Sequence, residues 1–261
     1  MNSLFSARAI RRSMRSVLAL LANLGLTSLA FSALTIIDDF EVNEGHFTAN
    51  PNTGSGTSQG FVKTGGTAAT ADRVTTEAFT GIASQQIVID DDTAVAGSGA
   101  NQDSWRLRNL SGGGTPANNT TLTNTAGDTT YVGYWLKTSS PGLEAGIGID
   151  DGAALEIGAW RPVLADGAWH LYQWQFQDPA DWDPFAGTGP NGQIDAATVT
   201  IDNAFFRGGV GFPTGTDFDA TFFVDDVSWN PTGQIPEPSS LVLLGLSSLL
   251  LSGRRFRARV S

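Results

Sequence analysis

The sequence contains no cysteine, which excludes disulfides, thiolate metal sites and a lipid-modified cysteine anchor. A domain built from it must be held together by its hydrophobic core or by bound ions. Histidine is almost as scarce, with His46 in a turn and His170 in a segment of aromatic residues. A catalytic triad needs a histidine that is positioned by a carboxylate and lies beside a nucleophile. We therefore expect no serine or cysteine triad.

Clustered glutamates are also lacking. Glu77, Glu144 and Glu156 stand alone, and the Glu-x-Asp-x-x-Glu pattern of concanavalin-like glycosidases is absent from the sequence. Glycoside hydrolysis needs two carboxyl groups about 5 to 9 Å apart whose pKa values differ. Among so many acids, a pair at that distance arises by chance. We recognise no catalytic constellation, and an enzyme is kept only as an alternative.

Basic residues are scarce in the middle of the chain. Between Phe31 and Asn230, 25 acidic residues against 7 basic ones give a net charge of −18. Such a field repels nucleic acid and anionic lipid, and it favours cations or uncharged partners such as neutral glycans. We therefore expect no nucleic-acid partner.

The N-terminus has the pattern of a secretory signal peptide. A basic region is followed by an apolar stretch over residues 16–29, with small residues Ser28 and Ala30 at its end. This order predicts a helical signal peptide over residues 1–30, cut after Ala30 or a few residues later. The alternative is a retained N-terminal anchor, against which the small residues argue. Arg11 and Arg12 are followed by residues that fit a twin-arginine signal poorly, so we expect export by the Sec machinery.

Residues 31–230 alternate between short apolar segments and turns rich in Gly, Asn and Asp. In 130–138, for example, Val132, Tyr134 and Leu136 fall on one face of a strand. No window shows the apolar stripe of an amphipathic helix. The pattern predicts one all-β domain, an antiparallel, jelly-roll-like β-sandwich. Its expected strands are 34–41, 73–79, 84–90, 104–109, 130–138, 143–149, 154–159, 169–177, 197–206 and 221–229.

Residues 231–261 combine three different segments. Pro236 and Pro238 fix an extended backbone around Glu237. The uncharged run from Leu241 to Leu251 is short for a membrane-spanning helix, which needs about 20 apolar residues. The arginines that follow resist translocation and would act as a membrane stop. They are Arg254, Arg255, Arg257 and Arg259.

This order of segments resembles the PEP-CTERM sorting signal of exported bacterial proteins. The resemblance implies a hydrophobic C-terminal helix that anchors the protein transiently in the inner membrane. It also implies an exosortase that recognises the tail, cuts at or near the Pro-Glu-Pro, and delivers the protein to the cell surface or extracellular matrix. The alternative is an ordinary single-pass anchor with an incidental Pro-Glu-Pro.

The middle region resembles a galactose-binding-like jelly roll, the architecture of many carbohydrate-binding modules. The resemblance rests on segments 131–138, 166–174 and 221–227. It implies a structural Ca²⁺ that joins the first strand to the last, because a hard cation binds several oxygen ligands. The matching acids are Asp39, Glu41, Asp225 and Asp226. The alternative is that these acids are solvated strand ends.

A distinctive loop at 178–192 combines acids, prolines and aromatic residues. Aromatic rings stack on the C–H faces of sugars, while carboxylates accept hydroxyl hydrogen bonds. Trp182 is the first candidate for such a ligand platform, and Trp135 and Trp160 are the next. The alternative is that Trp182 folds back over the end of the sandwich, because tryptophan is usually well buried.

Together these features predict an exported surface or matrix protein, without catalytic activity, that binds exopolysaccharide. The alternatives are a carbohydrate-active enzyme or an ancillary glycan-binding module of the same fold, and a calcium-dependent adhesion domain.

Overall fold

The computed structural model describes residues 34–42, 65–92, 105–125, 129–209 and 218–237, together with residues 47, 51, 53, 58, 60, 61 and 63. All of them belong to the unit Ser32–Ser261. The expected signal-peptide helix and the C-terminal hydrophobic helix lie outside the described residues. Within these ranges no helix has the length and apolar character needed to span a membrane.

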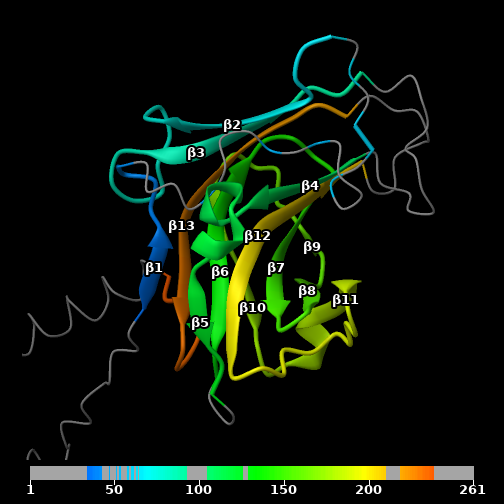
Figure 1. The fold of residues 1–261 in the computed structure, drawn as a ribbon. Coiled ribbons are helices and arrows are strands. Elements are labelled where there is room, and N and C mark those ends of the chain that lie inside the picture. The colour runs from blue at the N-terminus through cyan, green and yellow to red at the C-terminus, as the bar shows by residue number, and fades with distance from the viewer. Residues whose placement is uncertain are drawn as a thin grey trace, which may run out of the picture. The chain divides into compact units, whose positions relative to one another are not determined.

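The described chain forms two antiparallel sheets, and the prediction of an all-β antiparallel sandwich is confirmed (Figure 1). Sheet A has the order β10-β6-β13-β3-β2, with β1 beside β13. Sheet B has the order β11-β8-β7-β12-β4, with β5 beside β12 and β9 beside β7.

The strands of sheet A are β1 (Thr35–Asp38), β2 (Ala69–Val74), β3 (Ser84–Ile89), β6 (Tyr131–Thr138), β10 (Trp169–Gln175) and β13 (Ala220–Asn230). Those of sheet B are β4 (Trp105–Leu110), β5 (Thr121–Thr123), β7 (Leu143–Asp151), β8 (Ala154–Gly158), β9 (Arg161–Pro162), β11 (Trp182–Gly187) and β12 (Thr198–Gly208). Three single-turn 3₁₀ helices are η1 (Gly112–Gly114), η2 (Pro116–Asn118) and η3 (Pro179–Asp181).

The core lies between the sheets and follows the alternation seen in the sequence. Tyr134 of β6 is fully buried, and its hydroxyl donates to the carbonyl of Gly146 on the opposite sheet at 2.7 Å. Phe206 of β12 meets Phe222 of β13 with ring centroids 4.7 Å apart. These aromatic contacts join the two sheets, because aromatic pairs add to the stabilisation that burial provides.

Two predicted segments differ from the structure. The expected strand 73–79 is observed as β2, which begins earlier and ends at Val74, where its partner β3 begins at Ser84. The chain after β2 instead crosses the outer face of sheet A, where Phe79 stacks on Trp135. The expected loop 178–192 contains η3 and the edge strand β11, which pairs with β8.

Candidate functional site

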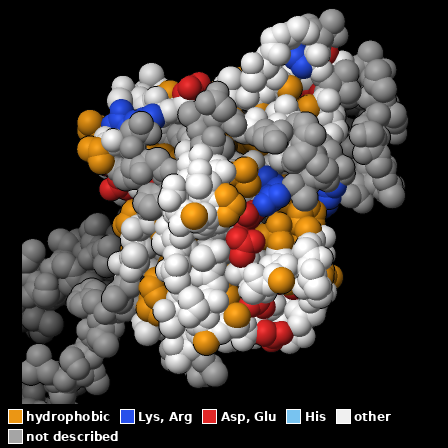
Figure 2. Space-filling model, in the orientation of Figure 1, with side chains coloured by type: hydrophobic (Ala, Val, Ile, Leu, Met, Phe, Trp, Pro, Cys, Tyr) orange, Lys and Arg blue, Asp and Glu red, His pale blue; other side chains and the backbone are white. Residues whose placement is uncertain are grey.

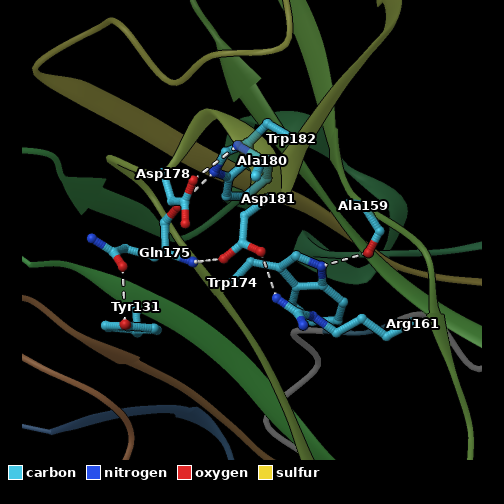
Figure 3. A network of polar contacts seen from close by, with 9 residues as sticks. All are labelled: Tyr131, Ala159, Arg161, Trp174, Gln175, Asp178, Ala180, Asp181 and Trp182. Carbon is cyan, nitrogen blue, oxygen red and sulfur yellow. Dashed lines mark hydrogen bonds and ion pairs between the residues drawn. The ribbon is translucent and has the colours of Figure 1, made fainter.

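Trp182, the first predicted ligand platform, is part of the core. It is 3% exposed and its indole N–H donates to the carbonyl of Gln175 at 2.8 Å (Figure 3). Beside it, Asp181 accepts from the amide of Gln175 at 2.7 Å and pairs with Arg161 at 2.6 Å. This network fastens the turn before β11 to the end of β10. The structure therefore agrees with the alternative interpretation, in which Trp182 folds back over the sandwich.

Trp135 is also covered. Its side chain is 7% exposed, and Phe79 stacks on its ring with centroids 3.8 Å apart and planes within 13°. A sugar has no access to that face while Phe79 lies there. Of the three predicted tryptophans, Trp160 alone is partly open to solvent.

Trp160 lies on the outer face of sheet B, where β7 has a glycine instead of a side chain. A Cβ added at Gly146 would come within 3.2 Å of the Trp160 ring. The ring therefore lies directly over the strand, next to Phe205 of β12 at 4.9 Å between centroids. Phe185 of β11 contacts the other side of Phe205, with centroids 5.2 Å apart and rings edge to face. Phe205 is fully buried beneath these two half-buried rings.

An arginine covers each of the two outer rings. The guanidinium of Arg207 lies 4.5 Å from the ring centre of Trp160, and that of Arg106 lies 5.6 Å from Phe185. Arg207 also donates to the carboxylate of Glu144 on β7. Figure 2 shows basic side chains beside acidic and hydrophobic ones in the region of β4 and β12. We call the three rings, the two arginines and the glutamate described above the sheet B platform. Its members are Arg106, Glu144, Trp160, Phe185, Phe205 and Arg207.

Two arginines of the platform lie opposite one another on neighbouring strands. Arg106 and Arg207 are direct cross-strand partners, and like charges opposite one another destabilise a sheet. Stacking on aromatic rings and pairing with Glu144 offset part of that repulsion. The two guanidinium groups carry planar sets of N–H donors and lie beside an apolar surface. This combination suits sugars, whose hydroxyl groups accept hydrogen bonds.

Neither Phe185, Phe205, Arg106 nor Arg207 was predicted from the sequence as a site residue. Phe185 was visible in the distinctive loop, but its partner on β12 is found only when strand register is known. The signal that could have indicated the site is the alternation in β7, where Gly146 and Gly148 occupy outward positions between buried Ala145, Ile147 and Ile149.

The four predicted calcium ligands lie near one another at the junction of β1 and β13. Burial raises the pKa of Asp226, and the charges of Asp39 and Glu41 raise it further. Burial also raises the pKa of Asp225 to about 7, with a further contribution from the charge of Asp226. The sequence prediction that the first and last strands bring these acids together is consistent with this arrangement.

Backbone amides already donate hydrogen bonds to several of the carboxylate oxygens of these acids. Asp225 accepts from the amides of Phe79 at 2.7 Å and Thr80 at 3.3 Å, and Glu41 accepts from those of Ile82 and Ala83. Across the described ranges, no group of three or more His, Asp or Glu side chains is arranged to hold a metal ion. The acids thus fasten the turn at 79–83, and the Ca²⁺ site stays a prediction.

The start of the predicted sorting segment is described, and most of it is not. Pro236 is half-buried and Glu237 is exposed. Pro238 and the four arginines of the predicted membrane stop, Arg254, Arg255, Arg257 and Arg259, lie outside the described residues.

Solved structures similar to this chain include two carbohydrate-binding modules of Clostridium thermocellum. The family 11 module of a cellulosomal cellulase has 13% identity and a TM-score of 0.41, covering 78% of this chain and 97% of the module. A C-terminal family 22 module has 14% identity and a TM-score of 0.36, covering 77% and 94%. An endo-β-1,4-glucuronan lyase from the fungus Trichoderma reesei has 14% identity and a TM-score of 0.35, covering 71% and 94%.

No curated protein matches the sequence. A family model described as the PEP-CTERM protein-sorting motif matches residues 234–258. This is the segment that the order of proline, apolar and basic residues indicated. The chain therefore carries a PEP-CTERM protein-sorting motif that begins four residues after Asn230, the last residue of β13.

Proposed function

We propose that this chain is an exported surface or matrix protein whose β-sandwich binds exopolysaccharide. The observation that carries the proposal is the sorting motif at residues 234–258, since a protein with this motif is a substrate for exosortase processing. The Sec machinery exports the chain, the C-terminal tail holds it in the inner membrane, and an exosortase cuts at or near the Pro-Glu-Pro.

The sheet B platform supports the glycan-binding part of this proposal. Trp160 and Phe185 supply apolar ring surface, and Arg207 and Arg106 supply N–H donors beside it. Sugar sites commonly combine these two features, because a pyranose presents both C–H faces and hydroxyl groups. The acidic field of the rest of the domain favours a neutral polysaccharide over a polyanion.

Binding is tested by pull-down of the host's own exopolysaccharide with the Trp160→Ala protein. Trp169→Ala is the matched control, because Trp169 is a half-buried tryptophan on β10, in the other sheet. We expect Trp160→Ala to lose at least tenfold in affinity while Trp169→Ala binds like the wild type. Equal binding by all three proteins would refute the platform as the site. Shortened glycan chains after incubation with the wild type would instead favour the alternative, a carbohydrate-active enzyme.

Sorting is tested by changing the exposed acid of the motif. Glu237→Ala leaves the sandwich intact, because Glu237 is exposed and follows the last buried residue of the chain that the structure describes. We expect the variant to remain in the membrane fraction with its tail attached. Normal release of the variant would show that the Pro-Glu-Pro is incidental and that the tail is an ordinary anchor.

A further inference from the structure

The sorting motif begins inside the folded sandwich. The matched segment starts at Gln234, whose carbonyl accepts from the side-chain amide of Asn230 at 2.8 Å. The next residue, Ile235, is 3% exposed, and its amide donates to the side-chain oxygen of Gln173 at 2.9 Å. Pro236 is half-buried and Glu237 exposed. The first residues of the motif are thus held against the sandwich.

The contacts on the sandwich side come from sheet A. Asn230 is the last residue of β13 and is buried, and its side chain also accepts from the amide of Thr232 at 3.2 Å. The Thr130 hydroxyl donates to the carbonyl of Pro231 at 3.3 Å. Gln173 lies on the edge strand β10 opposite Gly133 of β6. A Cβ added at Gly133 would come within 2.3 Å of the backbone carbonyl oxygen of Tyr172 and within 2.8 Å of Gln173, so the glycine allows β10 to lie close to β6.

Gln173 points away from the core, because Tyr172 and Trp174 on either side of it are buried between the sheets. Ile235 is therefore held at the outer face of sheet A. Burial of an isoleucine side chain together with one hydrogen bond favours the docked state over the undocked one by roughly tens- to hundreds-fold.

A processing enzyme needs the chain on both sides of its cut in an extended, accessible form. In the docked state the residues before Pro236 are bonded to the sandwich and are not available. The tether on the other side is short, since the four Cα-to-Cα steps from Glu237 to Leu241 span at most about 14 Å. The residues before Pro236 therefore become accessible to an enzyme at the membrane surface only when Ile235 leaves its position on sheet A.

We propose that the docking of Ile235 on sheet A controls access to the sorting motif, so that the Pro-Glu-Pro is processed from the undocked state. This inference rests on the proposed function, in which an exosortase cuts the tail. It requires no chemistry from this chain, only a local opening of a segment held by Gln173 and Asn230. Such openings of a chain end are low in free energy and precede global unfolding.

The test compares Gln173→Ala with Gln175→Ala in the full-length protein. Both glutamines are half-buried on β10, but the side chain of Gln175 accepts from the Tyr131 hydroxyl and not from the tail. Hydrogen exchange of the 231–237 segment, measured on detergent-solubilised protein, reports docking. A pulse-chase in the host reports the rate of tail removal.

We expect Gln173→Ala to speed both exchange at Ile235 and tail removal about two- to tenfold, as loss of one hydrogen bond predicts. Gln175→Ala should change neither. Unchanged exchange in Gln173→Ala would refute the docking, and faster exchange with an unchanged or slower tail removal would refute the control of access. Equal acceleration by Gln175→Ala would refute the specific role of Gln173. A wild type that keeps its tail would instead refute the proposed sorting.

Discussion

The two outer faces of the sandwich are built for different contacts. On sheet A, uncharged groups of Gln173 and Asn230 hold the start of the sorting motif. On sheet B, Arg106 and Arg207 stack on aromatic rings and face one another across the strands. The first face holds the start of the protein's own sorting motif, and the second carries the platform that we propose as the glycan site. In this proposal, tethering and binding take place on opposite sides of one domain.

Both faces depend on a glycine at an outward strand position. A Cβ at Gly133 would come within 2.3 Å of the backbone carbonyl of Tyr172, and a Cβ at Gly146 would come within 3.2 Å of the Trp160 ring. The first glycine lets β10 lie close to β6, and the second lets the Trp160 ring lie over β7. Gly146→Ala should therefore disturb the platform, whereas Gly133→Ala should disturb the pairing of β6 with β10 and with it the docked tail.

The largest expected effect is a loss of stability that distinguishes Trp182 in the core from Trp160 in the sheet B platform. Trp182→Ala removes a buried ring and should lower the free energy of unfolding by about 3–5 kcal/mol. Trp160→Ala should cost clearly less, because its ring is partly exposed. Urea denaturation of both variants measures the difference. A larger loss for Trp160→Ala would contradict the assignment of Trp182 to the core.

The next largest expected effect is a loss of polysaccharide binding when a basic residue is removed from sheet B but not from sheet A. Arg207→Ala on sheet B should weaken polysaccharide binding about tenfold, since a hydrogen bond from a charged donor contributes about 1.5–3 kcal/mol. Lys137→Ala is the control on sheet A, where Lys137 pairs with Glu77 at 2.6 Å. Isothermal titration of both proteins should show a loss for Arg207→Ala alone, and a similar loss for Lys137→Ala would contradict the role of the sheet B platform.

Part of the pH dependence of stability should come from Asp225 on sheet A. Burial raises the pKa of Asp225 from 3.8 to about 7, so the folded protein holds a proton there that the unfolded chain has lost. The contribution of this group to the free energy of unfolding should therefore fall as pH rises between about 4 and 7. Melting curves should show a decline of Tm over that window that Asp225→Asn reduces. An identical decline in the variant would contradict the assignment.

The smallest expected effect concerns the predicted Ca²⁺ at Asp39, Glu41, Asp225 and Asp226. A bound ion stabilises the folded state by mass action, and about 1 kcal/mol corresponds to 2–4 °C in a domain of this size. Chelator should lower Tm by that amount at pH 8 and by less at pH 5, where Asp225 is protonated. If chelator leaves Tm unchanged, the prediction of a bound Ca²⁺ is wrong. The acids then serve only to hold the turn at 79–83.

The sequence was sufficient for the fold and for the sorting motif, because both depend on local patterns. The alternation in 130–138 places Val132, Tyr134 and Leu136 in the core as predicted. The segment around Pro236 and Glu237 is contiguous, so its order of residues could be recognised directly.

The sheet B platform could not be predicted because its members come from four strands and from the link between β8 and β9. Trp160, Phe185 and Phe205 meet only through the pairing of β7 with β12 and of β8 with β11. Trp182 was a candidate because its loop appeared exposed in the sequence. The structure instead pairs Trp182 with Gly158 of β8, where the absence of a side chain leaves room for the neighbouring ring of Trp174.

The central claim, that this chain is an exported sandwich sorted through its C-terminal motif, is tested most directly by the intact mass of the protein recovered from the cell surface. We predict a mass that lacks residues 1–30 and every residue beyond the Pro-Glu-Pro, with the sandwich complete. A mass that still includes Arg254 to Ser261 would contradict it.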